Sequence, residues 1–171
     1  EAYEIIEKHT GEPIDRESIR ARRTQRELEL LKSEEVMPGV VDLIADAKER
    51  NLRLGVASSS DRKWVIGHLM RLGLHTHFES IRCADDVSNT KPSPDLYLSV
   101  LSDMGLQPHQ AIAFEDSLHG VEAVKQAGIF CVAVPNNVTR HLPMPKADLT
   151  VDSLSEMELE EYIKKAQREP Q

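Results

Sequence analysis

Two patterns of apolar residues succeed each other along the chain, with a change near residue 36. Before that point apolar side chains recur at helical spacing, a glycine and a proline break the pattern at 10–13, and a second helix is predicted over about 15–33. After it, short continuous apolar runs alternate with amphipathic stretches. The runs predict strands over 52–57, 80–83, 111–114, 129–134 and 147–151, and the stretches predict helices over 40–47, 64–72, 94–104, 118–127 and 156–165.

The alternation of strands and helices determines the expected fold class. Parallel strands are connected by helical crossovers, so a sheet of this kind is covered by helices on both faces. We therefore expect an α/β fold, a Rossmann-like three-layer sandwich with a parallel sheet, over residues 37–171. Residues 1–36 are expected to form part of a separate helical subdomain, and the Met37-Pro38-Gly39 segment is expected to form the hinge between the two.

The composition narrows the class of partner. The 171 residues carry 21 Lys and Arg against 29 Asp and Glu, a net charge of −8. This charge argues against nucleic acid or an anionic membrane surface as the main partner. No apolar run approaches the roughly 20 residues that span a bilayer. The two cysteines, Cys83 and Cys131, form no C-x-x-C pair and are expected to be buried thiols. Together these features predict a protein of the reducing cytoplasm, and we expect a monomer.

Polar residues that directly follow the strands carry the candidate chemistry, because ligands of an open parallel sheet bind at the carboxyl ends of its strands. Ser58, Ser59, Ser60 and Asp61 follow the first strand and lead into a helix. Hydroxyl and backbone N–H groups at a helix N-terminus can form an anion site. The alternative is structural: Ser60 or Asp61 caps the helix, and the others only shape the turn.

Lys91 lies in the loop after the second strand and is followed by prolines at positions 92 and 94. An ammonium group that is held stiffly in such a loop can neutralise a phosphoryl group as a point charge. A solvated surface lysine is the alternative, because that is the usual environment of lysine. Asp85 and Asp86, earlier in the same loop, are expected to be turn and cap residues rather than metal ligands.

Two adjacent acids, Glu115 and Asp116, follow the third strand, which is apolar throughout. Carboxylates at the edge of a sheet suit a hard divalent cation such as Mg²⁺, which takes oxygen ligands. The alternative is a capping aspartate beside a solvated glutamate. Gly120, just inside the following helix, indicates a close approach of another group to the backbone there.

The three strand-end segments occur together and in order, and with them the chain resembles the haloacid dehalogenase-like superfamily of phosphatases and phosphomutases. The resemblance is to its β-phosphoglucomutase-like branch, which has a helical cap. The matching segments are Leu54-Gly55-Val56-Ala57-Ser58-Ser59-Ser60, Lys91-Pro92-Ser93-Pro94-Asp95-Leu96-Tyr97 and Ala113-Phe114-Glu115-Asp116-Ser117-Leu118-His119-Gly120.

The resemblance implies a role for each candidate residue. It implies that Ser58 and Lys91 are catalytic, Ser58 by hydrogen bonding to the transferring phosphoryl group and Lys91 by neutralising its charge. Ser59 would join them in binding phosphate, and Glu115 and Asp116 would hold Mg²⁺. Residues 1–36 would be the later part of the helical cap.

One motif of the family is missing. An Asp-x-Asp pair should follow an N-terminal strand, its first Asp acting as the nucleophile and its second as the general acid and base, yet no Asp-x-Asp occurs in the chain. That strand would lie between the strand that ends at Ser58 and the one that ends at Phe114. We therefore expect the nucleophile to lie upstream of Glu1, and the chain by itself to be inactive.

For the intact protein the resemblance implies a Mg²⁺-dependent phosphatase, a phosphoric monoester hydrolase. It would act on a small phosphorylated metabolite such as a sugar phosphate through an aspartyl-phosphate. The first alternative is a β-phosphoglucomutase-type phosphomutase. The second is a non-catalytic domain that keeps the fold and binds phosphate, a metal or a protein partner.

Overall fold

The computed structural model describes residues 2–168, and the chain forms two compact units that meet between Glu35 and Val36. The first unit contains two helices, α1 (Ala2–Thr10) and α2 (Arg16–Leu31). An ion pair of 2.7 Å between Arg16 and Glu7 joins them, and the Arg16 guanidinium lies 5.6 Å from the centre of the Tyr3 ring. None of the side chains described in this unit is buried, so these polar contacts hold its helices together without a core.

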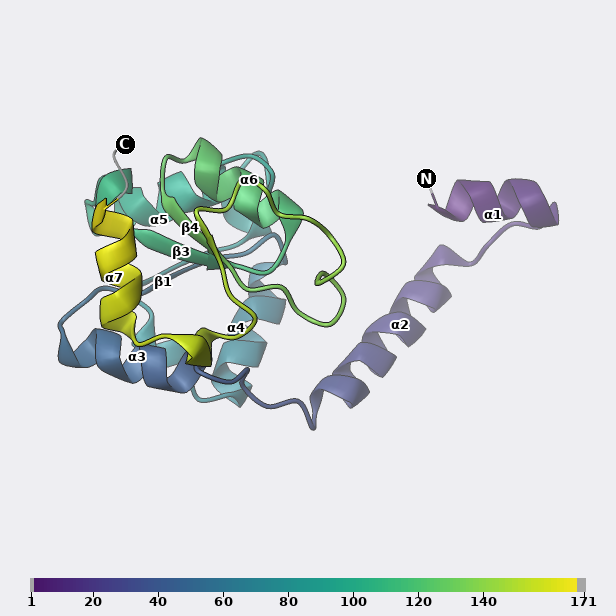
Figure 1. Ribbon diagram of the computed structural model, residues 1–171. Coiled ribbons are helices and arrows are strands. Elements are labelled where there is room, and N and C mark those ends of the chain that lie inside the picture. The colour runs from purple at the N-terminus through teal and green to yellow at the C-terminus, as the bar shows by residue number, and fades with distance from the viewer. Residues whose placement is uncertain (1, 169–171) are drawn as a thin grey trace. The chain divides into compact units, whose positions relative to one another are not determined.

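The second unit alternates strands and helices as the sequence predicts (Figure 1). Within residues 2–168 no helix is both long and apolar enough to cross a bilayer. The predicted elements are all present, with boundaries shifted by a few residues. In chain order they are α3 (Val40–Glu49), β1 (Gly55–Ala57), α4 (Arg62–Arg71), β2 (Ser80–Arg82), α5 (Asp95–Met104), β3 (Ile112–Glu115), α6 (Leu118–Gln126), β4 (Phe130–Ala133), β5 (Leu149–Thr150) and α7 (Leu159–Arg168).

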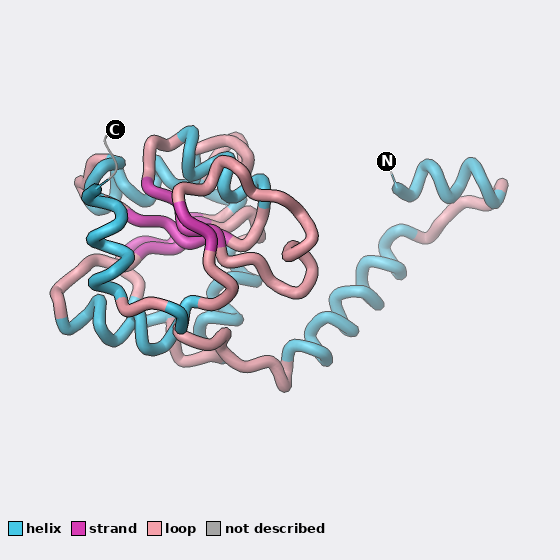
Figure 2. Tube along the Cα trace, in the orientation of Figure 1, coloured by secondary structure: helices cyan, strands magenta, loops and turns pink. Residues whose placement is uncertain are grey.

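All strand pairs described in the second unit are parallel. Helices surround the strands (Figure 2), and the predicted α/β class is thereby confirmed. The sheet is divided into two pieces, with strand orders β1-β2 and β3-β4-β5, and the division falls between the two strands that the sequence analysis expects a further strand to separate. Among the described residues β1 pairs only with β2, and β3 pairs with β4 alone. One edge of β1 and one edge of β3 therefore make no strand hydrogen bonds in this part of the chain.

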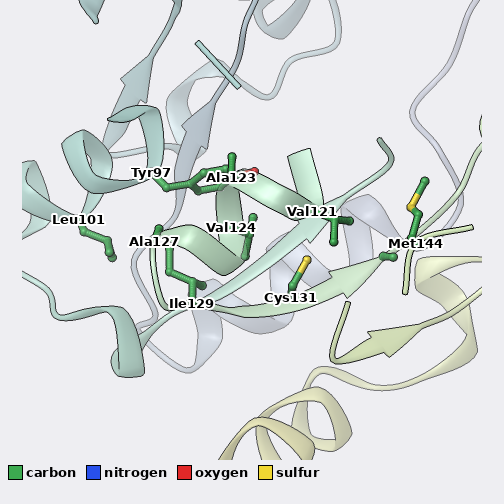
Figure 3. Packing of buried hydrophobic residues seen from close by; sticks show 10 residues of the cluster. Tyr97, Leu101, Val121, Ala123, Val124, Ala127, Ile129, Cys131 and Met144 are labelled. Atoms are coloured by element: carbon green, nitrogen blue, oxygen red, sulfur yellow. The ribbon is translucent and has the colours of Figure 1, made fainter. Parts of the chain in front are cut away.

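Side chains from β3 and β4 point alternately into two cores, one on each face of the sheet. Cys131 and Ala133 pack on one face with buried residues of α5 and α6, among them Tyr97 and Val124 (Figure 3). Val132, between them in sequence, packs on the other face with Tyr162 of α7 and Leu43 of α3. Because successive side chains of a strand point to opposite faces, a strand buried on both faces reads as a continuous apolar run. This is the three-layer arrangement that the sequence predicts.

Candidate active site

The serine-rich segment after β1 forms a fixed turn at the carboxyl end of the strand. The Ser58 N–H donates to the Arg82 carbonyl at 2.9 Å, which continues the β1–β2 ladder, and the Ser60 N–H donates to Ser58 Oγ at 3.2 Å. The helix is capped by Asp61, whose carboxylate accepts from the Trp64 N–H at 2.9 Å. Capping therefore falls to Asp61 alone, and the hydroxyl groups of the preceding serines are not needed for it.

Lys91 is held against the same strand ends and is not a solvated surface lysine. Its side chain is only 13% exposed, and its ammonium group forms a short ion pair with Glu115 Oε1. The ammonium also lies 5.0 Å from the centre of the Tyr97 ring, within the range of a cation–π contact. Its backbone N–H donates to Ser59 Oγ at 3.3 Å. The structure thus brings Ser59, Lys91 and Glu115 together from three separate segments of the chain.

Glu115 ends β3 and points into the molecule. Its Oε1 atom accepts short hydrogen bonds from both Lys91 and the Tyr97 hydroxyl, and its Oε2 atom lies 3.5 Å from Ser117 Oγ. A Cβ atom added at Gly120 would lie 1.8 Å from Oε2, a separation that real atoms do not adopt. The close approach predicted at Gly120 is therefore confirmed, and the group that approaches is the Glu115 carboxylate.

The environment of Glu115 changes the acidity of its neighbours. Burial, followed by the charge of Glu115, raises the pKa of the Tyr97 hydroxyl far above its ordinary value, so that Tyr97 stays a hydrogen-bond donor. Burial also raises the pKa of the Cys131 thiol, to about 12. Cys83 and Cys131 are both free and fully buried, as expected for apolar packing residues.

Asp116 has a different environment, although it follows Glu115 directly. Its side chain is exposed, and its Oδ2 atom accepts a hydrogen bond of 2.7 Å from the Asn136 amide nitrogen. Asn136 follows β4 in a tight turn. Asp85 and Asp86, by contrast, accept hydrogen bonds from nearby backbone N–H groups, at 2.5 and 2.7 Å. They are turn and cap residues, as the sequence predicts.

Two residues of the site, Tyr97 and Asn136, are assigned no role by the sequence reasoning. Asn136 is a polar residue that follows a strand, as the other candidates are. It follows β4, however, and the sequence analysis assigns candidate residues only to the first three strands. Tyr97 lies in the matching segment that begins at Lys91, yet a tyrosine on an amphipathic helix is indistinguishable from a packing residue. Its hydroxyl contact with Glu115 becomes evident only in three dimensions.

Glu115 and Asp116 fit a Mg²⁺ site in which substrate phosphate oxygens and water supply the remaining ligands. Within residues 2–168 no group of three or more His, Cys, Asp or Glu side chains is placed to hold a metal ion. Mg²⁺ is commonly bound by one or two carboxylates together with substrate phosphate oxygens and water. Asp116 offers an exposed carboxylate, and Glu115 has one oxygen, Oε2, that is not bonded to Lys91 or Tyr97. The pair is therefore compatible with such a site.

Comparison with known proteins places these segments in a family. The chain is 43% identical over 157 residues to YhcW of Bacillus subtilis (strain 168), whose name describes a phosphatase. The aligned residues make up 92% of this chain and 71% of YhcW. The chain is 33% identical to the β-phosphoglucomutase of the same organism, over 81% of this chain and 60% of the mutase. The chain thus spans about two thirds of the length of these relatives.

A solved structure shares the fold. The crystal structure of CbbY from Rhodobacter sphaeroides in complex with xylulose-1,5-bisphosphate superimposes with a TM-score of 0.74 and 35% identity, over 85% of this chain and 68% of that chain. Residues 2–134 match the sequence profile of the haloacid dehalogenase-like hydrolases, a range that includes all three predicted motif segments. The chain therefore belongs to the haloacid dehalogenase-like hydrolase family and has β-phosphoglucomutase-like relatives within it.

Proposed function

We propose that the complete protein is a Mg²⁺-dependent phosphatase of small phosphorylated metabolites, with sugar phosphates as the substrate class. The observation that carries this proposal is the partly buried lysine at the strand ends. Lys91 is held by Glu115 and Tyr97 close to the serine segment, a placement that a surface lysine would not require. The names of the relatives support the same chemistry, because they describe a phosphatase, a phosphomutase and a complex with a sugar bisphosphate.

In the proposed reaction Ser58 and Lys91 act on the phosphoryl group, and Ser59 helps to bind it. The Ser58 oxygen accepts from the Ser60 N–H, which leaves its own proton for a phosphoryl oxygen. The Lys91 ammonium neutralises the charge on the transferring group from a fixed position. Catalysis of phosphoryl transfer is mostly positioning and charge neutralisation, so these residues supply what the chemistry needs.

Asp116 and Glu115 would hold Mg²⁺, Asp116 through its exposed carboxylate and Glu115 through Oε2, the oxygen that Lys91 and Tyr97 do not use. When bound, the metal would supply positive charge that stabilises the phosphoryl oxygens. The substrate phosphate would be attracted by Lys91 and by the serine donors.

The nucleophile is proposed to be an aspartate outside these 171 residues. Its carboxylate oxygen would attack phosphorus, the ester oxygen would leave with a proton, and water would hydrolyse the aspartyl-phosphate. The free edges that β1 and β3 keep within the described residues support this proposal, because a further parallel strand can pair with such an edge. The monomeric state, the cytoplasmic location and the identity of the first unit as part of a cap remain predictions.

Phosphate release tests the proposal directly. The complete protein is expected to release phosphate from sugar phosphates and from p-nitrophenyl phosphate in the presence of Mg²⁺, and to lose this activity with a chelator. Residues 1–171 alone are expected to give no turnover. Folded complete protein that releases no phosphate from either type of substrate would contradict the proposal and favour a non-catalytic binding domain.

A phosphomutase is the second candidate, because one relative carries that name. In that case the phosphoryl group returns to a second hydroxyl of the sugar instead of passing to water. Incubation with a hexose 1-phosphate separates the two candidates. A phosphatase yields free sugar and phosphate, whereas a mutase yields the isomeric hexose phosphate with little phosphate release.

A further inference from the structure

Asn136 connects Asp116 to the turn that follows β4. Its amide nitrogen donates to Asp116 Oδ2 at 2.7 Å, and its Oδ1 atom accepts from the backbone N–H groups of Val138 and Thr139 at 2.8 and 3.1 Å. Its own N–H donates to Thr139 Oγ1 at 3.0 Å. Both polar atoms of the half-buried Asn136 side chain are therefore hydrogen-bonded, the oxygen to the turn and the nitrogen to Asp116.

The turn determines which end of the Asn136 amide faces Asp116. Two N–H donors converge on one end of the amide, and only its oxygen can accept from them. The nitrogen must then be the atom that faces the carboxylate, since a reversed amide would place oxygen against oxygen. The donor to Asp116 is thus fixed by the backbone of residues 138 and 139 and not by the carboxylate itself.

We propose that Asn136 is a positioning residue that holds the Asp116 carboxylate in one orientation and leaves Oδ1 as a single ligand atom for Mg²⁺. Without the amide, the exposed carboxylate rotates freely. Within residues 2–168, the Oδ1 atom of Asp116 makes no hydrogen bond or ion pair, so it is available to bind a metal ion. The proposal rests on the proposed function in one respect, namely that Asp116 is a ligand of Mg²⁺.

The expected benefit is both affinity and selectivity. Partners that orient a metal-binding carboxylate typically change metal affinity or activity by 10- to 100-fold when they are removed. Mg²⁺ needs near-ideal octahedral geometry, whereas Ca²⁺ also accepts a bidentate carboxylate. A hydrogen bond to Oδ2 opposes the bidentate mode. Asn136 should therefore favour Mg²⁺ over Ca²⁺.

The test is calorimetric titration of the complete protein with Mg²⁺ alone and with Ca²⁺ alone. In Asn136→Ser the hydroxyl can still accept from the turn N–H groups, but it is too short to reach Asp116. We expect this variant to bind Mg²⁺ about tenfold more weakly, and its Ca²⁺ affinity to change by less than about threefold. Thr139→Val is the matched control: it removes one hydrogen bond of the same turn and leaves the amide–carboxylate contact in place. Its Mg²⁺ affinity should stay within about twofold of the unsubstituted protein.

Two results would overturn the proposal while leaving the proposed function intact, provided that Asp116→Ala abolishes Mg²⁺ binding. One is an Asn136→Ser variant that binds Mg²⁺ normally, and the other is a Thr139→Val variant that is weakened as much as Asn136→Ser. Normal Mg²⁺ binding by Asp116→Ala would overturn both the metal assignment and the role of Asn136. If the expected binding changes are found in a protein that releases no phosphate, the positioning role stands and the proposed catalysis fails.

Discussion

The inner side of the site, formed by Glu115, Lys91 and Tyr97, differs sharply from its outer side, formed by Asp116 and Asn136. Glu115 is 6% exposed and receives short hydrogen bonds from the partly buried Lys91 and the buried Tyr97. Asp116 is exposed and receives one bond from a turn. Adjacent acids of the same chemical class thus have different tasks. A buried charge must be paired to be stable, whereas an exposed charge is free to bind a ligand.

The two sides therefore contribute differently to folding stability and to ligand binding. On the inner side, structure and function cannot be separated, because removing either partner leaves a buried charge without compensation. On the outer side, solvent stabilises the carboxylate, so substitutions there should change binding and leave folding intact.

The largest effect is expected for Lys91→Ala compared with Asp116→Ala. Both variants should lose at least about a hundredfold in kcat/KM for phosphate release, because each removes a charge from the site. Only Lys91→Ala should also unfold more easily, by about 3 kcal/mol, since Glu115 stays buried without its cation. Asp116→Ala should change the free energy of unfolding by less than about 0.5 kcal/mol. Urea unfolding and phosphate release measure the two quantities.

A double variant serves as the control for the Lys91 result. Lys91→Met combined with Glu115→Gln removes both charges together, so most of the lost stability should return while activity stays absent. If the double variant is as unstable as Lys91→Ala, the buried ion pair is not the cause of the instability. Equal instability of Lys91→Ala and Asp116→Ala would remove the proposed distinction between the two sides.

A smaller effect is expected for Gly120→Ala, which acts on the inner side through its shape. The added methyl group would take the position of the Glu115 Oε2 atom and push the carboxylate away from Lys91. We expect a loss of about 2 kcal/mol in the free energy of unfolding. Gly67 of α4 offers a matched control, because no atom lies within 4 Å of a Cβ placed there. Gly67→Ala should be neutral or stabilising by up to about 1 kcal/mol, and a similar cost at both glycines would contradict the argument.

The smallest effect at neutral pH is expected for Tyr97→Phe, about 1 kcal/mol for one lost hydrogen bond. The two proteins should differ more clearly in how the free energy of unfolding changes at alkaline pH. The folded-state pKa of Tyr97 lies above its ordinary value of 10.0, so folding stability is complete below that pH and falls as the pH rises through it. The slope is about 1.4 kcal/mol per pH unit for each such group. Urea unfolding between pH 10 and 11 should show a slope that is shallower by about this amount in Tyr97→Phe, and identical slopes in that range would refute a buried, protonated Tyr97.

Most of the second unit could be predicted from the sequence, because its strands are buried on both faces and therefore read as continuous apolar runs. The boundaries are less accurate. The apolar run predicts a strand over 52–57, but β1 begins at Gly55, where pairing with Ser80 starts. The sequence predicts a closing helix from residue 156, but α7 begins at Leu159, after a short turn that Ser153 caps. The ends of both elements are determined by hydrogen bonds to other residues, near or distant in sequence. The periodicity of apolar residues carries no information on these bonds.

The candidate site was predictable as a set of segments but not as a set of contacts. The strand-end rule selected Ser58, Lys91, Glu115 and Asp116, and the fold brings their segments to one region. The different environments of the two acids follow from their positions, because Glu115 is the last residue of β3 and Asp116 lies just beyond the strand. The partners of each acid depend on α5 and on the turn after β4, which are distant in sequence.

The two-sided packing of β4 has a consequence for variation in chain length. Cys131 and Ala133 face one core while Val132 faces the other, so inserting or deleting a single residue in β4 would exchange the residues of the two cores. The exposed segment 140–143, beyond the turn that holds Asn136, has no such constraint, and Leu142 there is 50% exposed. Natural relatives should therefore differ in length within that segment and keep β4 constant, and a library of one-residue insertions would show the same contrast as a sharp change in the yield of folded protein.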